Sequence, residues 1–88
     1  MEPGDTGASA LVRRALVDAL ALDLLPEDIA GEQALHQHPV TMDSLGFHRV
    51  VVEMEVRRGA RFDEQALEST LFETVDDLVR FVAAQAPR

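Results

Sequence analysis

Apolar residues near the N-terminus recur at three- and four-residue spacing, which is typical of one face of an α-helix. This stripe predicts a helix that begins after a cap at Thr6 or Ser9 and runs to about Leu25, where Pro26 ends it. Its apolar members are Leu11, Val12, Ala15, Leu16, Ala19 and Leu20, and its polar face carries Arg13, Arg14 and Asp18.

A second stripe predicts a helix from Ser44 to about Arg58, with Asp43 as its N-cap and Gly59 as its left-handed stop. The β-branched run at 50–52 and the alternation over 53–56 would also suit a strand. We favour the helix because the cap, the stop and the length all agree with it. Its apolar face consists of Phe47, Val50, Val51 and Met54.

The C-terminal part of the chain predicts a third long helix, which begins after a cap at Thr74. Asp76 and Asp77 stand in its first turn, where the helix dipole favours negative charge, and we expect Asp76 to pair with Arg80. One short helical turn is expected between residues 62 and 68. The apolar face of the last helix consists of Val75, Leu78, Val79 and Val82.

The connection from Pro26 to Met42 shows no helical period and is long for so small a domain. We expect its spaced apolar residues to pin it to the core; these are Ile29, Leu35 and Val40. The fold class is therefore predicted to be all-α, a small four-helix bundle of three longer helices and one short helix with a long first loop. Residues 1–8 are expected to form a flexible N-terminal tail, and residues 9–86 the domain.

The composition excludes several classes of protein. A chain of 88 residues, 47% of them hydrophobic, is sufficient for one folded domain. The formal net charge of −8 disfavours nucleic acid and favours basic protein partners. No apolar run approaches the roughly 20 residues of a membrane span, and the basic and apolar regions of a signal peptide are missing. We therefore expect a cytoplasmic monomer that binds neither nucleic acid nor a membrane.

Ser44 occupies a position well suited to carry a phosphate ester. Because Asp43 caps the helix, Ser44 becomes the first helical residue, beside the positive end of the helix dipole. A phosphate group on its Oγ would be stabilised there. The sequence thus predicts that a phosphorylated group is attached to Ser44.

The residues around this serine form a wider pattern. Met42-Asp43-Ser44-Leu45 opens the second helix, which continues with Val50-Val51 and Met54-Glu55. Gly59 follows it, and Phe72-Glu73-Thr74-Val75 opens the last helix before Asp77-Leu78-Val79. With its long pinned loop, the chain resembles the acyl carrier protein family over most of its length.

The resemblance implies that Ser44 receives a 4'-phosphopantetheine arm from coenzyme A through a separate phosphopantetheinyl transferase. The thiol of the arm would carry acyl groups as thioesters to acyl-loading, ketosynthase-type or acyltransferase enzymes. The protein would then be a carrier and not an enzyme. Its lack of cysteine agrees with this role, because the arm would supply the reactive thiol.

Once the core face of the second helix is assigned, three apolar residues remain on another face of that helix: Leu45, Val52 and Val56. An apolar strip bordered by charge is expected to bind partner proteins. The alternative is that Val52 and Val56 simply complete the core. The residues expected to contact partners are Asp43, Leu45, Arg49, Val52, Glu53, Glu55 and Val56.

Two features depart from the family pattern. Thr41 stands two residues before Asp43, where glycine is common. The second helix is also less acidic than in carriers of fatty acid biosynthesis, because it contains His48, Arg49, Arg57 and Arg58. We therefore expect a free-standing bacterial carrier that serves polyketide or related specialised biosynthesis.

Other interpretations of the same residues are catalysis and metal binding. Ser44 and His48 are four residues apart and could pair as nucleophile and base, but no third group orients the histidine. His36, His38 and Glu32 could hold a metal, but the sequence supplies no further ligand on a rigid element. We expect neither a catalytic nor a metal site.

Two alternatives to an acyl carrier remain. One is an unmodified helical interaction module in which Asp-Ser-Leu is incidental. The other is a peptidyl or aminoacyl carrier, although Asp43 rather than histidine before the serine favours acyl cargo. Phe47, Val51 and Met54 would either line a cleft for that cargo or pack in the core.

Overall fold

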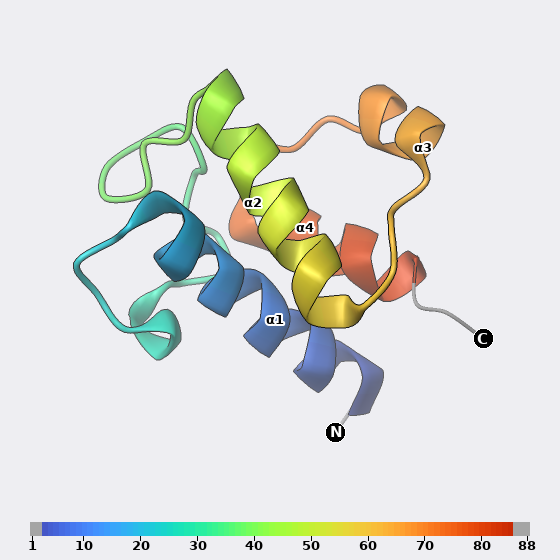
Figure 1. Cartoon of the computed structure of the whole chain (residues 1–88). Helices are drawn as coiled ribbons and strands as arrows, with labels where there is room; N and C mark the ends of the chain where they lie inside the picture. The colour runs from blue at the N-terminus through green and yellow to red at the C-terminus, as the bar shows by residue number, and fades with distance from the viewer. Residues whose placement is uncertain (1–2, 86–88) are drawn as a thin grey trace.

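The computed structural model describes residues 3–85 and contains four α-helices (Figure 1). These are α1 (Pro3–Leu20), α2 (Ser44–Arg58), α3 (Glu64–Ser69) and α4 (Val75–Ala84), and a 3-10 turn, η1 (Pro26–Asp28), lies in the first loop. Within this range the only β pairing is an isolated antiparallel bridge between Ala34 and Thr74. The expected all-α fold of three longer helices and one short helix is confirmed. No helix in the described range is long and apolar enough to cross a membrane.

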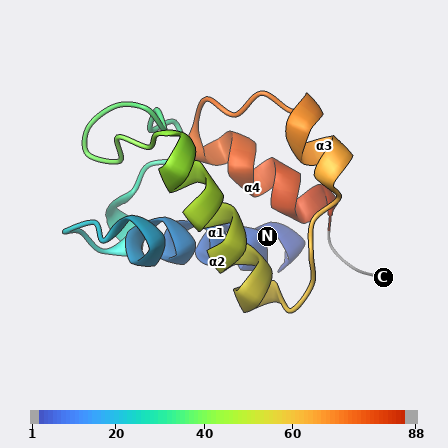
Figure 2. The ribbon, with the colours of Figure 1, turned by 45° about the horizontal axis from the view of Figure 1, so that its top comes forward.

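The helix α1 packs against both α2 and α4, and the core lies between these three helices. The short helix α3 lies on the far side of α2 and α4 from α1, as the two views of the ribbon show (Figures 1 and 2). The largest of the fully buried side chains come from all three long helices and from the first loop; they are Val12, Leu16, Leu35, Val50, Met54, Val75 and Leu78.

Both predicted ends of α1 differ from the structure. The helix begins at Pro3, because proline is tolerated in the first turn and Ala8 extends the buried stripe towards the N-terminus. Residues 3–8 therefore belong to the first turns of α1. Residues 1 and 2 of the expected tail, and residue 86 of the predicted domain, lie outside the described residues.

At its C-terminal end, α1 stops at Leu20 and does not reach Leu25. Ala21 has a φ of 53°, and the Leu22 N–H donates to the Val17 carbonyl at 3.0 Å. This is the hydrogen bond of a Schellman motif, with alanine in the left-handed position that glycine usually occupies. A stop of this kind carries no clear sequence signal when glycine is absent, so Pro26 was the wrong stop.

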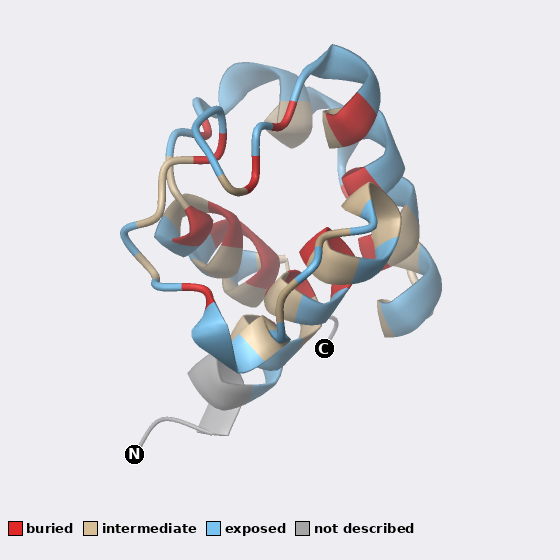
Figure 3. Cartoon of the chain, turned by 90° about the vertical axis from the view of Figure 1, so that its left-hand side faces the viewer, coloured by how far each residue is buried: buried red, intermediate tan, exposed pale blue. Residues whose placement is uncertain are grey.

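The first loop is pinned as predicted, because Ile29, Leu35 and Val40 are all buried. Figure 3 shows buried positions along this loop as well as on the inner faces of the helices. The main chain of Leu35 forms two hydrogen bonds, one through its N–H and one through its carbonyl. Its N–H donates to the Glu73 carbonyl at 2.8 Å, and its carbonyl accepts the Met42 N–H at 2.8 Å. The loop is thereby fastened both to the start of α4 and to the residue that precedes the cap of α2.

The predicted helix at residues 44–58 is confirmed, with Asp43 as its N-cap and Gly59 as its stop at a φ of 74°. The strand alternative is therefore wrong. On the predicted inner face, Val50, Val51 and Met54 are buried, and Phe47 is partly buried against the core. Phe47 contacts Phe72 with ring centroids 5.4 Å apart, which joins the start of α2 to the start of α4.

The cap of α4 is confirmed, but its predicted ion pair is wrong. Thr74 and Asp77 form a capping box, in which the Asp77 carboxylate accepts the N–H groups of Glu73 at 2.9 Å and Thr74 at 3.0 Å. Arg80 pairs with Asp77 and not with Asp76. The Asp76 carboxylate lies beside Gly31 of the first loop instead.

The residue Ala21 provides a direct test of how α1 ends. Replacing Ala21 with glycine is expected to raise the free energy of unfolding by about 1 kcal/mol, because glycine adopts the left-handed conformation without the steric cost of Cβ. Urea unfolding measures this change. The matched control is Gly59→Ala at the end of α2, which should lower stability by a similar amount. An Ala21→Gly variant that is less stable than the parent would show that α1 ends differently.

The capping box predicts a pH dependence of stability. Hydrogen bonds from the Glu73 and Thr74 N–H groups, with the charge of Arg80, lower the pKa of Asp77 below 3.8. A carboxylate whose pKa is lower in the folded state stabilises the protein above pH 3.8 and loses that effect as the pH falls through the folded pKa.

Asp77→Ala should therefore reduce the free energy of unfolding by about 1 kcal/mol at pH 7, and the difference from the parent should shrink below pH 3.8. Urea unfolding at a series of pH values measures it. Asp76→Ala, which removes an exposed carboxylate from the same turn, is the control and should show the smaller change. A deficit for Asp77→Ala that stays constant into acid would contradict this account.

Candidate functional site

The serine singled out by the sequence is the first residue of α2, and it is exposed. The preceding Asp43 is in an extended conformation, and its Oδ1 accepts the Gly46 N–H at 2.7 Å. This hydrogen bond turns the Asp43 carboxylate back over the first turn of the helix. The Ser44 hydroxyl therefore stands at the helix N-terminus as predicted.

Gly46 contributes to this arrangement in a way that the sequence reading missed. It is buried where α2 begins, and a Cβ added to it would lie 3.0 Å from Leu20 Cδ2 and 3.1 Å from Asp43 Oδ1. Such distances are tighter than ordinary van der Waals contacts. The absence of a side chain thus lets the end of α1 approach α2 closely beside the cap.

The two residues before the cap are held by main-chain geometry. Thr41 has a φ of 47°, a left-handed conformation that is rare for a β-branched residue. This is the position at which the resemblance predicts glycine, and the backbone conformation explains that preference. Met42 is buried, and its carbonyl lies 2.8 Å from Nδ1 of His36. A carbonyl oxygen only accepts, so Nδ1 of His36 carries the hydrogen.

A shallow pocket of about 280 Å³ opens beside the serine. His36 lines one part of it and the rings of Phe47 and Phe72 another, with Met42, Asp43 and Ser44 completing it. Sequence reasoning did not place His36 or Phe72 near Ser44. They come from the first loop and from the segment before α4, and no periodic pattern links such distant positions to α2.

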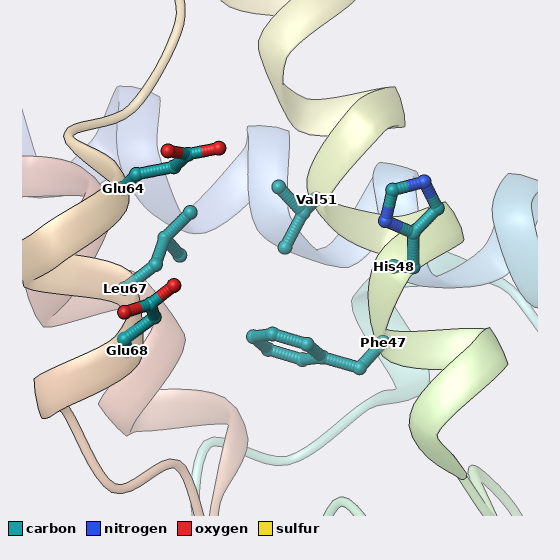
Figure 4. Close-up of a pocket in the computed structure, with 6 residues that line it drawn as sticks. All are labelled: Phe47, His48, Val51, Glu64, Leu67 and Glu68. Carbon is teal, nitrogen blue, oxygen red and sulfur yellow. The ribbon is translucent and has the colours of Figure 1, made fainter.

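A second cleft, of about 240 Å³, lies between α2 and α3 (Figure 4). Phe47, Val51 and Leu67 supply its apolar lining, and Glu64 and Glu68 of α3 line it together with His48. Of the three residues expected to line a cargo cleft, Phe47 and Val51 do so. Met54 is fully buried in the core and does not. Phe47 lines both this cleft and the pocket beside Ser44, so the two hollows adjoin.

The apolar strip on the outer face of α2 is exposed. Leu45, Val52 and Val56 expose 59%, 43% and 72% of their surface, so the alternative that Val52 and Val56 complete the core is wrong. Arg49 is also exposed, one turn after Leu45. We call the surface formed by Leu45, Val52 and Val56 the apolar strip.

The two glutamates expected beside this strip, Glu53 and Glu55, both interact with other groups of the protein. Glu53 binds the Arg57 guanidinium, with Oε2 and Nε 2.7 Å apart. Glu55 is turned towards the loop after α2, where its Oε2 accepts the Phe62 N–H at 2.8 Å and lies 3.9 Å from Arg61 Nε. The carboxylate of Glu55 thus has a structural role at the end of α2. A sequence pattern could not show this, because the bond is made by the main chain of Phe62.

The other chemical interpretations gain no geometric support in the described range. Ser44 and His48 line different hollows, and no hydrogen bond joins them among residues 3–85. Within the same residues, no group of three or more histidine, aspartate or glutamate side chains is arranged to hold a metal ion. His36 is instead bonded to Met42.

No family model matches the chain, and no curated protein does so either.

The cap of α2 predicts a stability effect close to Ser44. Asp43→Ala should reduce the free energy of unfolding by about 1 kcal/mol, since it leaves the Gly46 N–H without its acceptor. Chemical denaturation measures the change. Asp43→Asn, which keeps an acceptor oxygen in the same place, should lose much less. Equal losses in the two variants would show that the hydrogen bond to Gly46 is not what stabilises the start of α2.

Proposed function

We propose that this protein is an acyl carrier that holds a 4'-phosphopantetheine arm on Ser44 and delivers acyl thioesters to partner enzymes. The observation that carries the proposal is the exposed Ser44 hydroxyl at the N-terminus of a capped helix, beside a pocket and above an exposed apolar strip.

The residues present fit the attachment of such an arm. The Ser44 Oγ is accessible, so it can form the new bond to phosphorus. In that reaction the hydroxyl loses its proton, the pyrophosphate linkage of coenzyme A breaks, and adenosine 3',5'-bisphosphate leaves. A phosphodiester in this place is stabilised by the dipole of α2. When bound, the arm supplies the thiol that forms acyl thioesters, which the cysteine-free chain itself lacks.

Three side chains around the serine would orient the arm. Asp43 commits one carboxylate oxygen to the Gly46 N–H, which keeps the first turn of α2 in place under the attachment point. His36 donates through Nδ1 to Met42, so its second ring nitrogen remains to accept a hydrogen bond. Phe47 separates the pocket beside Ser44 from the cleft along α3.

The cleft between α2 and α3 supports acyl cargo. Its lining residues Phe47, Val51 and Leu67 offer apolar contact close to the point where the arm would begin. A volume of about 240 Å³ is below the usual range for drug-sized ligands, which begins at about 300 Å³, so it suits a short acyl segment.

The outer face of α2 supports delivery to other proteins. Three large apolar side chains exposed on one helix face form the kind of surface that a transient partner covers. The mixed charges of this helix, with Arg49 among its exposed residues, favour enzymes of polyketide or related specialised biosynthesis over a partner set that recognises a purely acidic helix.

The exposed strip would also suit a helical interaction module that is never modified, and one experiment separates the two functions. The purified chain is incubated with coenzyme A and a broad-specificity phosphopantetheinyl transferase, and its intact mass is measured. We expect the mass of one phosphopantetheine to be added, and Ser44→Ala to abolish the addition.

Ser69→Ala is the matched control, because Ser69 is an exposed serine of α3, and this variant should be modified like the parent. The absence of any addition with several transferases of different origin would reject the carrier function and leave the unmodified module. Addition to the Ser44→Ala variant would show that the attachment site is wrong.

A further inference from the structure

The apolar strip on α2 is bordered by different charged residues on its two sides. On the side of α1 lies a groove of about 420 Å³, lined by Arg49 and Glu53 together with Ala19, His48 and Val52. On the side of α3 lies the cleft that Glu64 and Glu68 line. His48 lines both hollows and therefore marks the ridge between them. The surface thus has one arginine and one glutamate on the side of α1 and two glutamates on the side of α3.

Arg49 is the cation of this surface that remains available to form an ion pair with a partner protein. Its nearest carboxylate along the helix, Glu53, binds Arg57, and Arg57 also pairs with Asp18 of α1. Together these three side chains carry one net negative charge, and the carboxylates of Asp18 and Glu53 both bind Arg57. Arg49 forms no ion pair within residues 3–85, and its side chain is exposed.

The position of Arg49 on α2 places its charge within the surface that a docking partner would cover. It stands four residues after Leu45, three before Val52 and seven before Val56, so it lies on the same face as all three members of the apolar strip. A partner that covers the strip must therefore cover Arg49 as well. Removing this charge from water without a counter-charge costs free energy, and a basic side chain placed against it costs more.

We infer that the partner enzymes of this carrier present an acidic side chain against Arg49 and a basic side chain against Glu64 and Glu68, on either side of an apolar pocket for Leu45 and Val52. The inference rests on the proposed function, because it concerns the proteins to which Ser44 would be presented. Two charges of opposite sign also define the direction in which a partner can lie across α2.

The charge at Arg49 is opposite in sign to the net charge of the whole chain. The net charge of −8 attracts basic proteins from a distance. A uniformly basic docking surface would nevertheless meet Arg49 at contact, so such an enzyme would associate and yet fit poorly. Selection among carriers is then made at Arg49 and not by the overall acidity of the chain.

A second copy of the chain is the competing occupant, since Arg49 of one copy could meet Glu64 and Glu68 of another. Two observations favour a different protein. Each copy carries a charge of −8, which opposes self-association, and the apolar strip consists of only three side chains, fewer than a stable dimer interface requires.

The first test uses a phosphopantetheinyl transferase with a uniformly basic docking surface as the probe. Arg49→Glu should raise kcat/KM for loading of Ser44 about two- to fivefold, because it removes the repulsion at contact. Glu68→Arg should lower it by a similar factor. Arg14→Glu and Glu27→Arg, which make the same charge changes at exposed positions on α1 and in the first loop, are the controls and should change kcat/KM much less.

The second test compares two ketosynthase-type enzymes as probes, one with an acidic residue beside the apolar pocket at its entrance and one with only basic residues there. The loaded carrier should transfer its acyl group faster to the first enzyme, and Arg49→Glu should reverse the preference. An unchanged preference, an equal effect of Arg14→Glu, or a dimer in sedimentation that Arg49→Glu dissociates would each overturn the inference. Failure of Ser44 to be loaded in the parent chain is a different result, which rejects the proposed function itself.

Discussion

The placement of Ser44 depends on how the long loop between α1 and α2 is tied down at Leu35. The side chain of Leu35 is fully buried, its N–H is bonded to Glu73 before α4, and its carbonyl accepts the N–H of Met42. These bonds join the start of α4 to the residue that precedes the cap of α2. Asp43 then closes the first turn through Gly46. The serine is therefore presented by a loop that the core holds in place, although the loop contains only one turn of regular structure.

Features with a local chemical cause could be predicted from the sequence. The limits of α2 followed from Asp43 and Gly59, because a cap and a left-handed stop each need a particular residue type. The three loop pins followed from isolated apolar residues in a polar segment. The end of α1 could not be predicted, since Ala21 takes a conformation that its residue type does not favour. The Ser44 pocket was also missed, because His36 and Phe72 reach it only through the folding of distant segments.

The charged residues around the apolar strip also depend partly on the local sequence and partly on contacts between distant segments. The composition indicates an acidic protein, and the sequence placed Glu53 and Glu55 beside the apolar strip. In the fold, Glu53 is held by Arg57, and Glu55 accepts the N–H of Phe62. Arg49 borders the strip as expected, with the ion-paired Glu53 beside it, and Glu64 and Glu68 of α3, which were not expected there, line the cleft on its other side. Which charges meet a partner is thus decided by ion pairs and hydrogen bonds that form only after folding.

Under the proposed function, Ser44 carries a prosthetic arm in the cell. The most direct measurement is peptide mass spectrometry of the chain purified from the cells that naturally produce it. We expect a 4'-phosphopantetheine on the peptide that contains Ser44, with or without an acyl group on its thiol. An unmodified Ser44 in chain isolated from producing cells, or a phosphopantetheine on another residue, would contradict it.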